Sequence, residues 1–383
     1  MRVAQVVTLI SPDGAYGGPV RVAVNQLTAL AAAGHDVTLF ATHRGYASPP
    51  SEIDGVPLVS YPARTILPKV GFAGLGSPAL VARLSRELAD FDVVHVHLAR
   101  DLVTLPAAWV ALRKGVPLVV QTHGMIDRSA NLLAAPLDAV LTRPVLAAAS
   151  TAFYLTEQEA VDLREVSGER IQLQQLVNGV PKSHKRALPN EEDTEVLFLA
   201  RLHPIKRARI FLLAALQLTL EFPQVRFSLV GPDEGTGHEV RQIIEAAHNP
   251  NIRWEGPLAP GATLARMAEA SIYVLPSIEE TFPMTVLEAA SIGIPVVISR
   301  SCGLAPQVTA FDAGRVFGGS VNELVEVLRP LLADRDSRLA TGANALRMSI
   351  ELFDMERVAA TLGETYETAR GTSAHRKGID HHG

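Results

Sequence analysis

Short runs of Val, Ile and Leu alternate with stretches of helical periodicity in the first part of the chain. Val3 to Ile10 is almost entirely apolar, Pro19 to Ala33 repeats apolar residues at helical spacing before Gly34, and Val37 to Phe40 is apolar again. This order predicts a strand, a helix and a second, parallel strand. Because the runs are apolar at nearly every position, we expect strands that are covered on both faces.

The same rhythm continues towards the middle of the chain. Further strands are predicted at Val93–His97, Pro117–Gln121 and Thr151–Leu155. Thr156 and Glu159 follow with the spacing of a capping box, which predicts that another helix begins there. The first half is therefore expected to be a Rossmann-like α/β domain with a mostly parallel, doubly wound sheet.

A polar and charged stretch from Pro181 to Asp193 interrupts this alternation and is interpreted as an interdomain linker. A second alternation follows, with strands predicted at 196–200, 225–230, 272–275 and 294–299 and helices near 206–220, 237–247, 261–270 and 284–292. We expect a first domain over 1–185, a second α/β domain over 186–350, and a C-terminal helix in 351–383 that crosses back to the first domain. The helical pattern runs from about Arg335 to Ala369, and a frayed tail is expected from His375.

Composition agrees with two globular domains. Of the 383 residues, 48% are hydrophobic and 20% are charged, which supplies enough apolar material for two cores. The formal net charge of −5 gives no general attraction to nucleic acid. Cys302 is the only cysteine, so no internal disulfide or zinc cluster is predicted, and a cytoplasmic location is expected. The apolar run at Met1–Val7 is too short for a signal peptide and is interpreted as the start of a buried strand.

No stretch approaches the roughly 18 apolar residues that a membrane-spanning helix needs. Peripheral contact with the inner face of a membrane stays open. Ala63–Phe72 mixes basic and apolar residues, which suits either contact with a lipid-linked acceptor or a simple surface loop, and the surface loop is favoured.

Ligands of open α/β sheets bind beyond the carboxyl ends of the strands. After the first predicted strand, Gly17 and Gly18 lie in a glycine loop that leads into a helix, where backbone amides can bind an anion. The strand that ends at Gln121 is followed by His123, in a place suited to a substrate-binding group. The alternative for the glycine loop is a purely structural turn, and the alternative for His123 is a histidine whose hydrogen bonds are all made within its own loop. His95 and His97 share one face of a strand and are interpreted as core or sheet-edge residues.

In the second half, Arg201 and Lys206 follow a predicted strand, five residues apart. A planar guanidinium and an ammonium at such a junction can clamp a diphosphate, although solvated surface charges are the simpler alternative. Gly231 follows the next strand and opens a loop suited to close approach of a ligand.

Pro276–Val297 is the most informative segment. Glu280 lies before a predicted helix and Glu288 about two turns inside it, so a carboxylate lies near the amide-rich helix start. Glu288 stands in an otherwise apolar helix, and a buried carboxylate requires a partner, for which a nucleotide ribose is suitable.

This segment resembles the donor-binding signature of family four glycosyltransferases of the GT-B fold. It has two glutamates separated by seven residues, followed by Ala-x-x-x-Gly-x-Pro-Val-Val. Other motifs that resemble the family occur in matching order: Gly17-Gly18, Thr122-His123-Gly124, Asn178-Gly179-Val180, Arg201 with Lys206, Gly231-Pro232 and Gly256. The resemblance spans about residues 3 to 370. Departures are Thr281-Phe282-Pro283 in place of the frequent Gly-Phe-Gly, Ala200 in place of glycine, and Val177 in place of proline.

The resemblance implies a GT-B fold, in which two Rossmann-like domains face each other across a cleft, the first binding the acceptor and the second the donor. It implies a retaining, metal-independent hexosyltransferase that uses a nucleotide-diphosphate sugar, either a UDP-sugar or GDP-mannose. The sugar would pass to a hydroxyl acceptor in polysaccharide, glycolipid or glycoconjugate biosynthesis. No cofactor beyond the donor substrate and no metal site are implied.

The resemblance also assigns roles to residues. Glu280 and His123 would surround the transferred sugar, and Arg201 with Lys206 would hold the diphosphate; these four form the catalytic set. The donor-binding set, with the glycine amides on phosphate and Glu288 on the ribose, comprises Gly17, Gly18, Gly231, Phe282, Pro283, Met284, Thr285 and Glu288.

Three other functions compete with this interpretation. An oxidoreductase would need a Gly-x-Gly-x-x-Gly loop, which is absent after the first strand of either domain. An epimerase or phosphorylase of the GT-B fold stays open, because fold does not determine function. A non-catalytic sugar-nucleotide-binding protein would be expected to have lost one of Glu280, Arg201 or Lys206. Asp334-Arg335-Asp336 imitates a metal-binding Asp-x-Asp, but it follows a predicted helix and is interpreted as a solvated turn.

Overall fold

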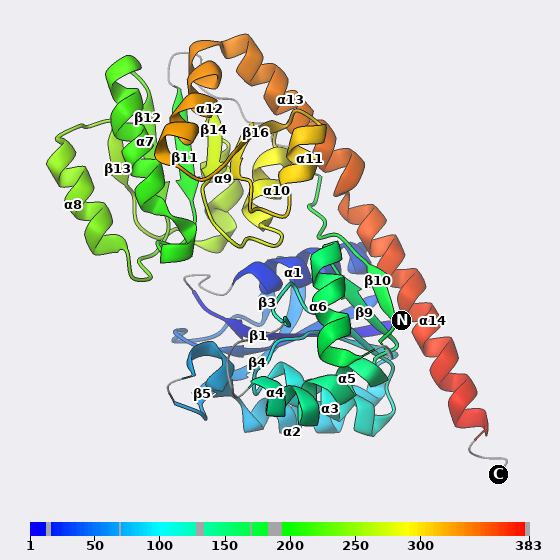
Figure 1. The fold of residues 1–383 in the computed structure, drawn as a ribbon. Helices are drawn as coiled ribbons and strands as arrows, with labels where there is room; N and C mark the ends of the chain where they lie inside the picture. Colours follow the sequence, from blue (N-terminus) through cyan, green and yellow to red (C-terminus); the bar gives the residue numbers. More distant parts are fainter. Residues whose placement is uncertain (13–16, 69, 128–133, 169–170, 183–193, 380–383) are drawn as a thin grey trace. The chain divides into compact units, whose positions relative to one another are not determined.

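A computed structural model of the protein describes residues 1–12, 17–68, 70–127, 134–168, 171–182 and 194–379. Within these ranges the chain divides into two compact units (Figure 1). Unit 1 contains residues 1–12, 17–179 and 355–379, and unit 2 contains 180–354. The division lies near the expected boundaries after residues 185 and 350. Most of the predicted linker, residues 183–193, lies outside the described residues.

The described part of unit 1 contains an eight-stranded sheet in the order β10-β9-β8-β7-β1-β2-β4-β3. Neighbouring strands are parallel except β3 and β4, which are antiparallel. The strands are β1 (Arg2–Ile10), β2 (Asp36–His43), β3 (Glu52–Ile53), β4 (Val56–Pro62), β7 (Val93–His97), β8 (Leu118–Gln121), β9 (Thr151–Tyr154) and β10 (Leu173–Gln175). A separate antiparallel pair joins β5 (Arg64–Thr65) to β6 (Leu75–Gly76).

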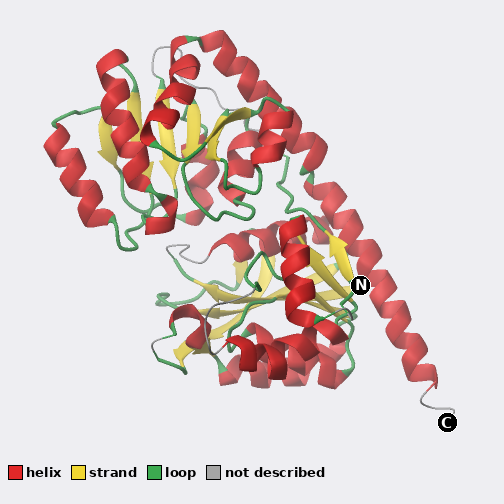
Figure 2. Cartoon of the chain, in the orientation of Figure 1, coloured by secondary structure: helices red, strands yellow, loops and turns green. Residues whose placement is uncertain are grey.

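Helices cover both faces of this sheet (Figure 2). They are α1 (Gly17–Ala32), η1 (Gly71–Gly74), α2 (Pro78–Glu87), η2 (Leu88–Asp90), α3 (Thr104–Lys114), α4 (Ala134–Leu137), η3 (Asp138–Thr142), α5 (Arg143–Ala148), α6 (Glu157–Ser167) and α14 (Met355–Ile379). On one face, Leu27 of α1 and Tyr366 of α14 pack with Val3. On the other, Leu84 of α2 packs in a cluster with Ala4. Successive residues of β1 thus enter opposite cores, which confirms the prediction from its continuous apolar run.

The described part of unit 2 contains a six-stranded sheet in which all neighbouring strands are parallel, in the order β13-β12-β11-β14-β15-β16. The strands are β11 (Glu195–Leu199), β12 (Arg226–Val230), β13 (Ile252–Trp254), β14 (Ile272–Leu275), β15 (Val296–Ser299) and β16 (Gly314–Phe317). The helices are η4 (Pro204–Lys206), α7 (Ala208–Glu221), α8 (Gly237–Ala247), η5 (Pro260–Ala262), α9 (Thr263–Met267), α10 (Met284–Ser291), α11 (Ala305–Ala310), α12 (Val321–Ala333) and α13 (Arg335–Leu352). Phe211 of α7 and Leu328 of α12 pack in the core cluster that contains Phe198 of β11.

The helical pattern from Arg335 is divided between two helices, and the second lies within 351–383, where a C-terminal helix is expected. The helix α13 ends at Leu352, and α14 begins at Met355. Phe353 lies between the two helices and is buried, and its ring meets Phe282 edge to face with the centroids 5.6 Å apart. The helix α14 continues to Ile379, past His375, where the frayed tail is expected to begin. None of the helices in the described ranges is long and apolar enough to cross a membrane.

Candidate functional site

Three predicted site residues meet at one edge of the unit 2 sheet. The strands β12, β11 and β14 are consecutive in that sheet and parallel, so their carboxyl ends lie side by side. Gly231 directly follows β12, Arg201 follows β11 after one intervening residue, and Glu280 lies in the loop after β14. The topology therefore collects residues that are 30 to 80 positions apart in sequence at the edge where α/β sheets bind ligands.

Gly231 is required by the packing of this edge. Its φ is 145°, and a Cβ atom there would lie 2.0 Å from the carbonyl oxygen of Ala200. The Gly231 amide donates to the carbonyl of Gly256 at 2.8 Å, and its own carbonyl accepts from Trp254 Nε1 at 2.9 Å. The group that approaches Gly231 closely is therefore the protein's own backbone at Ala200, and Gly231 joins the loops that follow β11, β12 and β13.

Both predicted cations have carboxylate partners in unit 2. Arg201 Nη1 lies 2.5 Å from Glu234 Oε2, and the Lys206 ammonium forms an ion pair with Glu280. The Lys206 and Glu280 side chains are only 17% and 14% exposed, so neither is the freely solvated charge of the simpler alternative. An anion that enters here would meet two fixed cations, but it would compete with two carboxylates.

The backbone around Glu280 is tightly held. Glu279 has a φ of 59°, a left-handed conformation that costs a non-glycine residue of order 1 kcal/mol and is common at functional sites. The Ile278 amide donates to the backbone carbonyl of Ile205, the residue before Lys206. The Gly303 amide donates to the backbone carbonyl of Glu280 at 2.8 Å. A Cβ atom at Gly303 would lie 2.0 Å from the Thr281 carbonyl oxygen. Gly303, which the sequence analysis missed, thus fixes the position of the Glu280 loop.

The helix α10 begins beside this loop. Pro283 is its N-cap residue and has an extended ψ of 115°, and no side chain caps the first turn. A helix start without a side-chain cap can offer first-turn amides to an anion, as the anion-binding hypothesis requires, although the Val286 amide already donates to the Pro283 carbonyl at 3.2 Å. Glu288 is the fifth residue of α10 and is 6% exposed. It lies little more than one turn inside the helix rather than the expected two turns, although the helix begins at Met284 as predicted.

The remaining predicted residues of this helix start have clear packing contacts. Met284 is buried, and Phe282 packs on Phe353. Thr285 Oγ1 lies 2.8 Å from the hydroxyl of Tyr273, which is also 3.1 Å from the carbonyl oxygen of Leu199. Burial raises the pKa of Tyr273, with Glu280 and Glu288 adding to it, so this hydroxyl stays neutral. Tyr273 ties α10 to β11 and gave no signal in the sequence.

In unit 1, a buried carboxylate shapes the loop that carries His123. His123 has a φ of 53°, and Glu159 Oε1 accepts from both of its neighbours, Thr122 Oγ1 and the Gly124 amide, each at 2.5 Å. Glu159 Oε2 accepts from the Leu155 amide at 2.7 Å. The predicted capping box is therefore only half right: Thr156 caps α6 through the Glu159 amide, but the Glu159 carboxylate turns back to this loop.

The His123 ring is joined to the core of unit 1. Its Nε2 lies 2.7 Å from Nδ1 of His97. Burial lowers the pKa of His123 to about 3, and burial together with the neighbouring histidines lowers the pKa of His97 as well, so both rings are neutral at pH 7. His95 and His97 are 0% and 1% exposed, which confirms that they are core residues.

Gly17 and Gly18 also belong to unit 1. Gly17 is the first residue of α1, and among the described residues no atom lies within 4 Å of the position that a Cβ of Gly18 would take. The preceding part of the predicted phosphate loop, 13–16, lies outside the described residues. Asp334 and Asp336 are exposed, and Asp334 caps α13 by accepting from the Ser337 amide at 3.1 Å, as the solvated-turn interpretation predicts.

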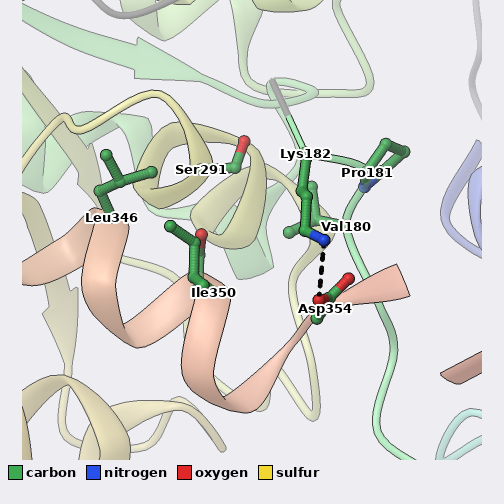
Figure 3. Close-up of a pocket in the computed structure, with 8 residues that line it drawn as sticks. Val180, Pro181, Lys182, Ser291, Leu346, Ile350 and Asp354 are labelled. Carbon is green, nitrogen blue, oxygen red and sulfur yellow. Dashed lines mark ion pairs between the residues drawn. The ribbon is translucent and has the colours of Figure 1, made fainter. Parts of the chain in front are cut away.

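Two hollows are lined by residues outside the predicted site set. A cavity of about 50 Å³ in unit 2 lies where Lys182 Nζ approaches Asp354 Oδ2 to 3.3 Å, with Ser291, Leu346 and Ile350 in its wall (Figure 3). It has room for a few water molecules. In unit 1, the 63–72 segment exposes Ile66 and Leu67 beside an open apolar groove, so its described residues lie at the surface.

Comparisons with known proteins agree with the two-unit division. Residues 17–179 match the family model described as "Glycosyl transferase 4-like domain", and residues 180–348 match "Glycosyl transferases group 1". The chain is 28% identical to a D-inositol 3-phosphate glycosyltransferase of Kribbella flavida, over 77% of this chain and 75% of that protein. It is also 28% identical to the protein of that name from Xylanimonas cellulosilytica, over 94% of each.

A solved structure shows the same fold. Anabaena Alr3699/HepE in complex with UDP and glucose superposes with a TM-score of 0.76 at 18% identity, covering 96% of this chain and 99% of that one. The expected α/β fold of GT-B type is confirmed by this likeness.

Proposed function

The chain belongs to the group 1 family of glycosyltransferases, and from this premise we propose that it is a retaining enzyme that uses a nucleotide-diphosphate sugar. The donor would be a UDP-sugar or GDP-mannose, and the acceptor a hydroxyl group in polysaccharide, glycolipid or glycoconjugate biosynthesis. One observation carries the proposal: Arg201, Lys206 and Glu280 gather at one strand edge of unit 2, beside the uncapped start of α10.

The arrangement suits a diphosphate. Arg201 supplies a planar fork of N–H donors, Lys206 supplies a compact positive charge, and the first-turn amides of α10 add the positive end of a helix dipole. Charge accumulates on the leaving diphosphate as the sugar departs, so fixed cations stabilise the transition state more than the ground state. We infer that these groups make a divalent ion unnecessary.

Glu280 and Glu288 would bind the two parts of the donor on either side of the diphosphate. Glu288, buried in the second turn of α10, would bind the ribose, and Glu280 would orient the sugar and stabilise its developing positive charge. The ion pair with Lys206 keeps the Glu280 carboxylate beside the diphosphate-binding cation. A phosphate oxygen of the leaving diphosphate would accept the proton of the incoming acceptor hydroxyl. The acceptor would then attack the sugar on the face from which the diphosphate departs. His123 would lie beside the transferred sugar.

The relatives support the nature of the substrates. The Anabaena complex contains UDP and glucose, which supports a nucleotide-sugar donor for the fold. The two related bacterial proteins are named for an inositol 3-phosphate acceptor, so that compound is a suitable first acceptor to test.

A binding experiment tests the donor assignment. Thermal unfolding is followed with UDP, GDP and their glucose, N-acetylglucosamine and mannose conjugates, because a ligand of the folded state raises the melting temperature. At least one nucleotide should stabilise the protein, and Arg201→Ala should reduce that stabilisation. Arg209→Ala is the matched control, because Arg209 is an exposed arginine of the same unit that pairs with Glu239. A lack of stabilisation by every nucleotide, or equal effects of both substitutions, would contradict the proposal.

A further inference from the structure

A chain of buried hydrogen bonds crosses unit 1 from the His123 loop. Its members, in order, are His123, His97, Gln5, Gln26, Gln121 and Asn178. The two histidines are joined by an N···N contact of 2.7 Å, and the four following links are N···O contacts of 2.9, 3.1, 3.0 and 3.2 Å. Five of the six are at most 2% exposed, and all lie within unit 1. Such a network has no place in a simple apolar core, since each polar group must be matched.

The chain has a direction. Each glutamine donates with its amide nitrogen towards Asn178 and accepts with its oxygen from the side of His123. Gln5 Oε1 can only accept, so His97 carries its proton on Nε2. The neutral His97 ring then offers a lone pair at Nδ1, and His123 must donate to it from Nε2. Reversal of a single amide would place two donors or two acceptors face to face.

We propose that His97 and Gln5 are positioning residues that hold His123 as the Nε2–H tautomer, so that its Nδ1 accepts a hydrogen bond from a hydroxyl of the sugar substrate. The identity of the ligand rests on the proposed function, whereas the tautomer rests on the hydrogen-bond chain alone. A histidine fixed in this way selects a hydroxyl donor and offers no proton itself.

The geometry favours a fixed ring. The planes of His97 and His123 differ by 4°, with centroids 5.0 Å apart and nitrogens 2.7 Å apart, so the hydrogen bond lies in the plane of both rings. Gln5 is itself anchored, because its Nε2 donates to Gln26 at 3.1 Å and lies 3.3 Å from the hydroxyl of Tyr366 in α14. The lowered pKa values of both histidines keep the rings neutral, as the chain requires.

His95 provides a matched control. It precedes His97 by two positions on β7, points to the same face and stacks on His97 with centroids 4.8 Å apart. Its Nδ1 lies 2.7 Å from the Tyr366 hydroxyl, and its buried Nε2 has no partner among the described residues. His95 is therefore as buried as His97 but does not bond to His123.

The first test is a long-range ¹H–¹⁵N spectrum of the full chain labelled at its 12 histidines, with no substrate present. The His123 signals are assigned by comparison with His123→Gln. The expected result at pH 7 is a neutral ring with the proton on Nε2. A proton on Nδ1, an even mixture of tautomers or a protonated ring would overturn the proposal. This spectrum needs no sugar, so it is decided separately from the proposed function.

The second test compares His97→Phe with His95→Phe in the same spectrum and in sugar transfer. Removal of the acceptor should leave His123 as a tautomer mixture and lower kcat by about tenfold, the order of one well-placed hydrogen bond. His95→Phe should keep the Nε2–H tautomer and stay within about twofold of the parent rate. If His97→Phe fails to fold, Gln5→Met removes the acceptor of the His97 Nε2 proton, one step along the chain, and should likewise leave His123 as a tautomer mixture. An unchanged His123 spectrum in the folded variant would refute the role of His97.

Discussion

Replacement of Glu234 by glutamine should strengthen donor binding, although a carboxylate is removed from the site. Glu234 lies 2.5 Å from Arg201, and the two side chains are 25% and 34% exposed. The proposed diphosphate needs the same guanidinium, so it must displace Glu234 and then stay near a like charge. Glu234→Gln keeps the size of the side chain and removes that competition.

The magnitude follows from two terms. A partly exposed ion pair such as Arg201–Glu234 stabilises the unliganded site by about 0.2–1 kcal/mol. In Glu234→Gln this ion pair is absent, so the diphosphate does not have to break it. Two unit charges about 6 Å apart repel by about 0.7 kcal/mol in water and about 2.8 kcal/mol at a surface dielectric constant of about 20. Salt screening reduces the second term. We therefore expect a net gain of about 1–2 kcal/mol, or about 5- to 30-fold tighter binding of UDP or GDP.

Isothermal titration calorimetry at about 0.1 M salt measures this change, and a double-mutant cycle identifies its cause. In the Arg201→Ala background, Glu234→Gln should lose the part of the gain that comes from the ion pair, about 0.2–1 kcal/mol, and keep the part that comes from charge repulsion. Glu239→Gln, which breaks the exposed pair with Arg209, is the control and should leave affinity unchanged. If Glu234→Gln weakens binding, Glu234 orients Arg201 for the ligand and the competition argument is refuted.

Three further results are expected. Lys206→Ala should weaken donor binding and turnover by about 1.5–3 kcal/mol, and unchanged affinity and rate by calorimetry and transfer assay would remove Lys206 from the diphosphate clamp. Turnover should persist in excess chelator, whereas a complete loss that added metal restores would show that the cations and α10 are insufficient. Glu159→Gln should lower kcat by about tenfold with little change in UDP affinity. The –NH2 group of the new glutamine would face the Leu155 amide, so two donors would meet and the His123 loop would loosen. An unaltered kcat would show that the loop needs no carboxylate.

The central strands could be predicted because burial on both faces leaves nearly continuous apolar runs, as in β1 and β14. The edge strands gave a weaker pattern: β10 (Leu173–Gln175) carries two glutamines, and its residues are not fully buried. The end of α14 could not be predicted either, because its sequence loses apolar periodicity before Ile379.

The site shows the same difference between local and long-range information. Arg201, Gly231 and Glu280 were found because each follows a recognisable strand. Glu234 was not found, because it pairs with Arg201 from 33 positions away in sequence. Gln5 was not found either, because it bonds to His97 from 92 positions away. The sequence supplies no spacing rule for contacts of that kind. Glu159 was noticed for its capping position, but its carboxylate serves a different loop.

The anomeric configuration of the product tests the central claim most directly. Proton nuclear magnetic resonance of the glycoside formed from an α-linked nucleotide sugar gives the configuration through the coupling of the anomeric proton. The account predicts an α-linked product, because Arg201 and Lys206 hold the leaving diphosphate on the face where the acceptor hydroxyl attacks and Glu280 stabilises the sugar without a covalent bond. A β-linked product would mean attack from the opposite face by a base-activated hydroxyl, and it would contradict the roles assigned to all three residues.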